Sequence, residues 1–109
     1  MDLLINAASF ALIKSGQKTV ETRLGNDENL RALAVDDELT IKNRDTDETV
    51  TVTITDIKHF VNSAAVAKTI DLKQIGDYGS AAEFLDRMRQ FQTEDEERQY
   101  GLMALFFTR

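Results

Sequence analysis

The clearest hydrophobic pattern of the chain lies between residues 49 and 55. Val50, Val52 and Ile54 alternate there with threonines, and a period of two is typical of a strand with one buried face. Residues 39–43 also have the pattern of a strand, and the polar segment 44–48 between the two has the composition of a turn. We therefore expect an antiparallel hairpin.

Helical periodicity comes before this hairpin. Residues 7–15 predict a short helix that Gly16 ends, and a strand follows over residues 19–23. Residues 26–33, with acidic side chains at the start, predict one or two helical turns.

The second half of the chain changes to a helical period. Short helices are predicted at residues 62–68 and 71–75, and Ser80 with Glu83 forms a capping-box pattern that opens a longer helix. The apolar side chains of this helix fall on one face, so we expect that face to pack on the sheet; they are Phe84, Leu85, Met88 and Phe91.

A second capping-box pattern, Thr93 to Glu96, opens an acidic turn that ends at Gly101. Residues 102–107 are continuously apolar, as in a buried strand. Strands from distant parts of the chain with helices between them predict an α+β fold, and 109 residues suit one domain spanning residues 1–109.

Composition excludes several classes of protein. No apolar run approaches the roughly 20 residues that cross a bilayer, so no membrane association is expected. The first ten residues hold no basic cluster of a signal peptide, which makes the cytoplasm the default compartment. The net charge of −6 repels phosphate at long range, so we expect no non-specific coating of DNA, and a role with nucleic acid requires a local pocket.

The sequence also lacks the residues and motifs that most metal and nucleotide sites require. The chain has no cysteine and one histidine, His59, which rules out thiolate and multi-histidine metal sites. Neither a phosphate-binding glycine loop nor calcium-loop spacing occurs. We expect no metal and no cofactor.

The remaining candidate is the segment GQKTVETR, residues 16–23. Strand alternation predicts Thr19, Glu21 and Arg23 on one face and Lys18 on the other, with Val20 and Thr22. Two interpretations stay open at this point. The charges form a surface Glu–Arg pair worth under about 1 kcal/mol, or they line a wet cleft.

This segment resembles the signature of the ASCH family of small PUA-like β-barrels, an aromatic residue and a helix end followed by Gly-x-Lys-Thr-x-Glu-x-Arg-Leu, here Phe10 to Leu24. Residues 56–63 and 96–105 are similar to later family segments, with Tyr100-Gly101 before the closing strand. Asp36 stands where the family usually has glycine, a substitution expected to strain the turn.

The resemblance implies a small PUA-like β-barrel of about five to six mostly antiparallel strands with short peripheral helices. It also implies a cleft that binds RNA or a nucleotide. The residues it nominates as ligand-binding are Lys18, Glu21 and Arg23, with Ser63 and Tyr100 in addition. Arg23 offers a planar fork for a phosphate or a base edge, Lys18 a point charge, and Glu21 an acceptor.

Some relatives imply instead an amidohydrolase that acts on an acylated nucleoside such as N4-acetylcytidine, in which Lys18 and Glu21 are the catalytic candidates. The threonine of that pattern is Glu21 here, and a nearby carboxylate keeps a lysine protonated, which suits binding better than catalysis. A ribonuclease, and a protein-interaction module with no nucleotide ligand, remain further alternatives. A positive pocket at Lys18 and Arg23 favours nucleotide binding, and a neutral, filled pocket favours the module.

Overall fold

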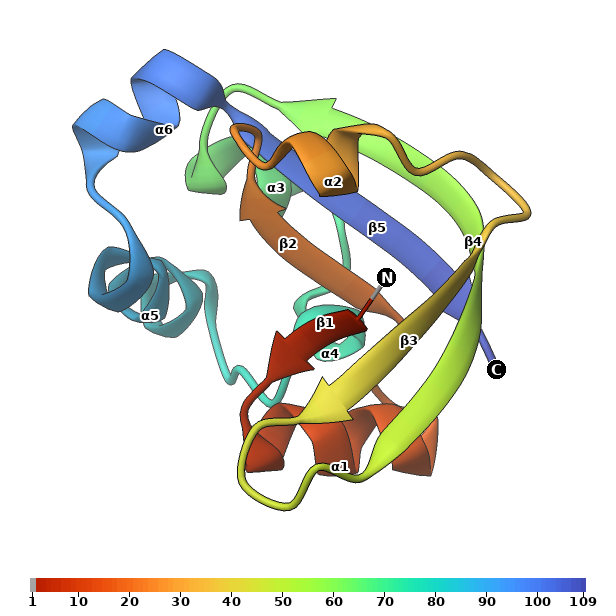
Figure 1. Cartoon of the computed structure of the whole chain (residues 1–109). Helices are drawn as coiled ribbons and strands as arrows, with labels where there is room; N and C mark the ends of the chain where they lie inside the picture. Colours follow the sequence, from red (N-terminus) through yellow and green to blue (C-terminus); the bar gives the residue numbers. More distant parts are fainter. Residues whose placement is uncertain (1) are drawn as a thin grey trace.

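A five-stranded sheet curls into a half-barrel in the computed structural model, which describes residues 2–109 (Figure 1). The strands are β1 (Asp2–Ile5), β2 (Val20–Leu24), β3 (Glu38–Asn43), β4 (Thr49–Phe60) and β5 (Leu102–Thr108). Their order is β1-β3-β4-β5-β2; β1 and β3 are parallel and the other pairs are antiparallel. Strands β1 and β2 are therefore the two edges of the sheet.

Six short helices accompany the sheet within residues 2–109. They are α1 (Ala7–Ser15), α2 (Glu28–Arg31), α3 (Ser63–Thr69), α4 (Leu72–Ile75), α5 (Ala81–Phe91) and α6 (Glu94–Tyr100). Helices α1 and α2 lie at opposite ends of the half-barrel, and α5 lies beyond the β2 edge of the sheet (Figure 1). These elements confirm the expected α+β class with a mostly antiparallel sheet.

Two apolar clusters hold the fold together. The first fills the concave side of the half-barrel, where side chains of β1, β3, β4 and β5 meet Phe10 and Ile13 of α1 and Leu30 of α2. The second lies on the other face of β2 and β5 and packs them against α3, α4 and α5. One face of β2 therefore packs in the second cluster, and its other face belongs to neither cluster.

Several local predictions are confirmed. The helix over residues 7–15 is α1, and Gly16 ends it with a φ of 88°, a left-handed conformation that favours glycine. The hairpin of β3 and β4 pairs Ile41 with Val50. The second capping box is complete in α6, where Thr93 and Glu96 accept each other's backbone N–H.

Other expectations need correction. Strand β1 was not predicted, and β4 continues to Phe60, beyond the alternating stretch. The side chain of Ser80 caps α5, but Glu83 accepts from the backbone N–H of Gly79, so that box is only half formed. Phe91 does not pack on the sheet and is 61% exposed.

The turn before β3 carries the backbone strain that the sequence predicted. Asp36 has a φ of 77°, in the left-handed region where a residue with a Cβ is disfavoured. Its backbone N–H donates to the carbonyl of Ile54 at 2.8 Å, which ties the turn to β4.

Within residues 2–109, none of the helices has the length and apolarity to span a bilayer.

Candidate functional site

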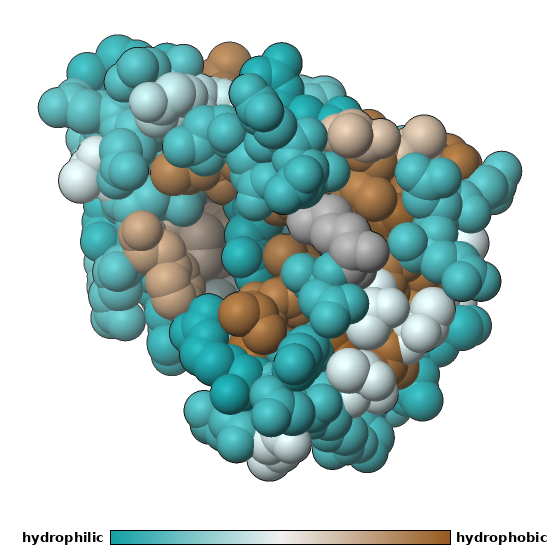
Figure 2. Space-filling model, viewed as in Figure 1, coloured by the Kyte–Doolittle hydropathy of each residue, from teal (hydrophilic) through white to brown (hydrophobic). Residues whose placement is uncertain are grey.

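A cleft of about 460 Å³ runs beside β2. Its walls come from β1 and α1 on one side, and from α5 and the segment after α4 on the other. In the space-filling view this face is hollowed between α5 and the half-barrel, and both hydrophilic and hydrophobic residues show there (Figure 2). The cleft contains all three charges of the GQKTVETR segment, Lys18, Glu21 and Arg23.

Lys18 is a buried, fully bonded ammonium. Its side chain is 2% exposed, and its Nζ lies 3.0 Å from Oε1 of Glu21. The same nitrogen donates to the carbonyl of Val20 at 2.7 Å and to the carbonyl of Ile75. An ammonium has three N–H donors, so every donor of Lys18 has an acceptor within the protein.

Glu21 joins the two cations. Its Oε2 lies 2.8 Å from Nη2 of Arg23 and accepts from Nε at 2.9 Å, while Oε1 faces Lys18. Burial alone would raise the pKa of Glu21, but the charges and hydrogen bonds of Lys18 and Arg23 outweigh it and lower the pKa below 4.5. The carboxylate is therefore ionised at neutral pH.

Arg23 crosses the opening of the half-barrel. Its Nη2 donates to the carbonyl of Leu4 in β1 at 2.9 Å, while its other contacts hold it to Glu21 on β2. One side chain thus links the two edges of the sheet. Among residues 2–109, nothing accepts from Nη1 of Arg23, so this end of the guanidinium keeps two unused donors.

The three charges lie together, but not as strand alternation predicted. Lys18 precedes β2, which begins at Val20, so the pleat does not set its direction. The prediction that Lys18 and Glu21 occupy opposite faces is wrong, because the lysine folds back and contacts the carboxylate. The interpretation as an exposed surface pair is wrong for Glu21, which is 9% exposed.

Two further arginines stand at the cleft. Arg44 follows β3, Arg87 lies on α5, and both are exposed. Neither forms an ion pair with any side chain of residues 2–109, which leaves both charges available to a ligand. The cleft lining holds four basic and four acidic side chains, so its formal charge is zero and the net −6 falls on the rest of the chain.

Aromatic side chains complete the cleft. Tyr78 packs edge to face on Phe84, with ring centroids 5.2 Å apart, and Phe91 lines the cleft while largely exposed. A Cβ on Gly76 would come within 2.7 Å of the Tyr78 ring, so the glycine makes room for that ring. Burial and the charges of nearby carboxylates, including Glu21, raise the pKa of Tyr78, so its hydroxyl stays a donor at neutral pH.

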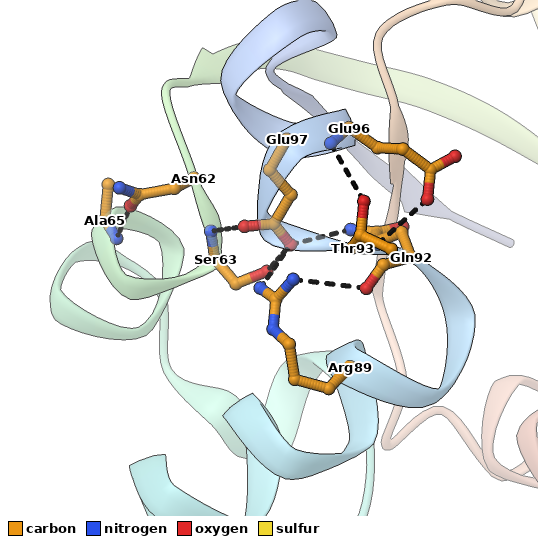
Figure 3. Close-up of polar contacts among 8 residues, drawn as sticks. All are labelled: Asn62, Ser63, Ala65, Arg89, Gln92, Thr93, Glu96 and Glu97. Atoms are coloured by element: carbon orange, nitrogen blue, oxygen red, sulfur yellow. Dashed lines mark hydrogen bonds and ion pairs between the residues drawn. The ribbon is translucent and has the colours of Figure 1, made fainter.

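Ser63 belongs to a second polar cluster (Figure 3). Its backbone N–H donates to Oε1 of Glu97 at 2.9 Å, and its hydroxyl donates to Oε2. Gln92 donates to the same carboxylate at 2.9 Å and Arg89 lies 2.8 Å from it. Burial raises the pKa of Glu97, yet these hydrogen bonds outweigh it and the pKa is lowered.

This second cluster joins α3, α5 and α6. Glu97 is 2% exposed and Ser63 is fully buried, so neither side chain is open to a ligand. Of the residues that the structure describes, Gln92 alone reaches both the cluster and the cleft. The structure therefore places Ser63 outside the cleft, and likewise Tyr100, which is 42% exposed at the end of α6.

Sequence reasoning missed Arg44, Arg87, Tyr78 and Phe91 as cleft residues. None carries a motif, and only the folded arrangement brings their segments to one place. The amphipathic pattern of α5 held one signal, since Phe91 lies at the end of its apolar face. His59 is exposed on β4, and within residues 2–109 no three acidic, histidine or cysteine side chains are placed to hold a metal ion.

The chain is similar in fold to two solved structures. The crystal structure of hypothetical protein PH0355 matches with a TM-score of 0.80 and 23% sequence identity, over 98% of this chain and 97% of that one. The solution NMR structure of protein PF0455 from Pyrococcus furiosus matches with a TM-score of 0.70 and 22% identity, over 98% and 96%. No family model and no curated protein matches the sequence. These likenesses establish the shared fold of a small α+β domain with a half-barrel sheet.

Proposed function

We propose that the cleft beside β2 binds a nucleotide, either free or as one unit of single-stranded RNA. In this proposal the chain is a PUA-like domain of the ASCH type. The observation that carries it is the fixed guanidinium of Arg23, which is buttressed by Glu21 and keeps two unused donors at Nη1 beside an open cleft. A guanidinium held in one orientation binds a base edge or a phosphate with little loss of side-chain entropy.

The rest of the lining suits the parts of a nucleotide. Arg44 and Arg87 form no ion pair among the described residues and can hold a phosphate. Tyr78 and Phe91 offer ring surface, on which unpaired bases stack. The volume of about 460 Å³ falls within the range of small-molecule sites. The lining is neutral and not positive, which by itself favours an interaction module, but the cleft is open and not filled by side chains. A neutral open cleft on a chain of net charge −6 fits one nucleotide better than a long polyanion.

The hydrolase alternative has less support. A general base needs a free lone pair, and Lys18 donates all three of its protons to protein acceptors, the carbonyls of Val20 and Ile75 and the carboxylate of Glu21. Release of acetate from N4-acetylcytidine, followed by proton NMR, tests this alternative directly. Turnover that disappears in Lys18→Ala, with the fold retained, would establish an enzyme.

The binding proposal is tested by titrating the four ribonucleoside monophosphates into ¹⁵N-labelled protein. We expect shifts at the Arg23 side chain and at Tyr78, and Arg87→Ala weakens binding about tenfold, the scale of one charge-assisted hydrogen bond. Arg98→Ala is the matched control, because Arg98 is exposed on α6 and lies outside the cleft. If no nucleotide shifts a cleft resonance, or both variants bind equally, the proposal fails.

A further inference from the structure

The main chain of β2 has a free edge inside the cleft. The N–H of Phe107 donates to the carbonyl of Thr19, and the N–H of Gly25 donates to the carbonyl of Gly101. Both pairs continue the register in which Val20 faces Phe106 and Leu24 faces Leu102. In an antiparallel pair, every second residue turns its N–H and C=O toward the partner strand.

This alternation fixes the direction of each backbone group. Glu21 and Arg23 turn their N–H and C=O toward β5, whereas Val20, Thr22 and Leu24 turn theirs away from it. Since β2 is the last strand of the sheet, these outward groups have no strand to pair with. The bond from Lys18 to the carbonyl of Val20 agrees with this assignment, because it comes from the open side.

The cleft lies along this edge. Glu21 and Arg23, on one face of β2, line it together with β1 and α1, and Thr22 and Leu24, on the other face, line it together with α5. A space that both faces of a strand border runs past the edge of that strand. Within residues 2–109, no hydrogen bond reaches the outward groups of Thr22 or Leu24.

We propose that the free edge of β2 at Thr22 reads the Watson–Crick edge of an unpaired base; this inference rests on the proposed function. In an extended residue the N–H and C=O lie side by side, a donor next to an acceptor. The Watson–Crick edge of each RNA base offers the complementary pair, and unpaired bases are commonly recognised there. The backbone of Thr22 then bonds the base, and the cleft arginines hold the phosphate.

The length of the free edge favours a base over an extended peptide. Adding a peptide strand needs several consecutive backbone pairs. Here Lys18 occupies the carbonyl of Val20, and Arg23 crosses from β2 to Leu4 of β1. Among residues 2–109, Thr22 and Leu24 are the only residues of β2 whose outward N–H and C=O both stay unpaired, which is enough for the edge of one base and too little for a stable added strand.

The first test compares methylated nucleotides. Once the tightest-binding ribonucleoside monophosphate is known, its base is blocked on the Watson–Crick edge, as in 3-methyluridine, N4,N4-dimethylcytidine, N6,N6-dimethyladenosine or 1-methylguanosine. The matched control carries methyl at C5 of a pyrimidine or C8 of a purine. We expect the blocked nucleotide to bind at least tenfold more weakly and the control within about threefold of the parent. Equal binding of blocked and control nucleotides overturns the proposal.

The second test follows the Thr22 amide proton by NMR during the same titration. The proposal requires this proton to shift and to exchange more slowly with solvent when the nucleotide binds. If Arg23 and Tyr78 respond while the Thr22 amide does not, the edge assignment is wrong and the proposed function stands. If no nucleotide moves any cleft resonance, both fall. If a short extended peptide, and no nucleotide, protects Thr22, the edge belongs to a peptide.

Two variants separate the backbone from the side chain. Thr22→Pro removes an N–H that the sheet does not use, a change that edge strands tolerate, and it is expected to weaken nucleotide binding about tenfold. Thr22→Val keeps the N–H and changes only the side chain, so it is expected to lose much less binding than Thr22→Pro. An NMR spectrum of each variant verifies the fold, and equal losses in both variants would contradict the role of the backbone.

Discussion

Replacing Glu21 by glutamine removes the negative charge that lies between Lys18 and Arg23 in the trio of these three side chains, of which Lys18 and Glu21 are buried and Arg23 is about one-third exposed. Lys18 keeps two carbonyl acceptors, but its charge loses its counterion, and the amide NH₂ of glutamine would meet the donors of Arg23. Removing one partner of a buried ion pair costs about 3–5 kcal/mol. Because glutamine keeps the shape and one acceptor oxygen, we expect the lower end, about 3 kcal/mol.

Urea unfolding at pH 7, followed by far-UV circular dichroism, measures this loss. With a slope of about 1.5 kcal/mol/M, the midpoint falls by about 2 M, and the melting temperature falls by about 12–20 °C. Glu48→Gln is the matched control, since Glu48 also pairs with a lysine, Lys14, but both side chains are about half exposed. That exposed pair is worth under about 1 kcal/mol.

The result that refutes the reasoning is a Glu21→Gln midpoint equal to that of Glu48→Gln. It would mean that water reaches the trio and screens its charges. A second check replaces Lys18 by methionine in the Glu21→Gln background. Since the unpaired ammonium causes most of the loss, the double variant is expected to be more stable than Glu21→Gln alone.

The pH dependence of unfolding carries a second signature of Glu21. Its pKa in the folded protein is lower than in the unfolded chain, so its contribution is fully present above the unfolded pKa. The contribution is lost as the pH falls through the folded pKa. The free energy of unfolding of the parent is therefore expected to drop from about pH 5 downward, and Glu21→Gln is expected to flatten that decline. Parallel curves for the two proteins would contradict the lowered pKa.

Three further substitutions test other parts of the structure. Ser63→Ala removes a hydroxyl donor from the buried carboxylate of Glu97 and is expected to cost about 1–2 kcal/mol in urea unfolding; an unchanged midpoint would mean that the carboxylate finds another donor. Asp36→Gly relieves a φ of 77° and is expected to raise stability by up to about 1 kcal/mol, whereas a loss would show that the aspartate side chain stabilises the turn. Gly76→Ala displaces the Tyr78 ring and is expected to weaken nucleotide binding about fivefold with little effect on unfolding; unchanged binding would separate that ring from the ligand.

Local interactions made much of the fold predictable. The alternation of Val50, Val52 and Ile54 identified β4, because one face of that strand packs on the core. The helix of residues 7–15 followed from its periodicity and from Gly16, whose left-handed conformation ends it. The capping box of α6 lies within four residues and depends on nothing distant.

Non-local pairing set the limits of prediction. Strand β1 is four residues long and pairs with β3, nearly 40 positions away, so its short sequence has no period to detect. Phe91 continues the apolar face of α5, but that face runs past the edge of the sheet into the cleft, where the ring stays exposed.

In the candidate site too, local features could be predicted from the sequence and contacts between distant residues could not. The motif identified the charges of Lys18, Glu21 and Arg23 because all three lie within six residues. The direction of Lys18 depends on the carbonyl of Ile75, contributed by the end of α4, and no sequence pattern specifies that contact. Ser63 was expected in the cleft, but its partner Glu97 comes from 34 residues later in the chain.

The position of the trio explains why Lys18 and Glu21 are buried although both are charged. An open half-barrel exposes two strand edges, and unpaired edges invite aggregation. Lys18 covers the carbonyl of Val20, Arg23 covers the carbonyl of Leu4, and the carboxylate of Glu21 pairs with both cations. These side chains make hydrogen bonds that a neighbouring strand would otherwise make at the edges of the sheet, and they leave the backbone of Thr22 uncovered. A variant of Lys18, Glu21 or Arg23 therefore loses binding both because a cleft side chain changes and because a strand edge is no longer covered. Substitutions at Arg87 and Thr22 leave that cover in place and test the cleft alone.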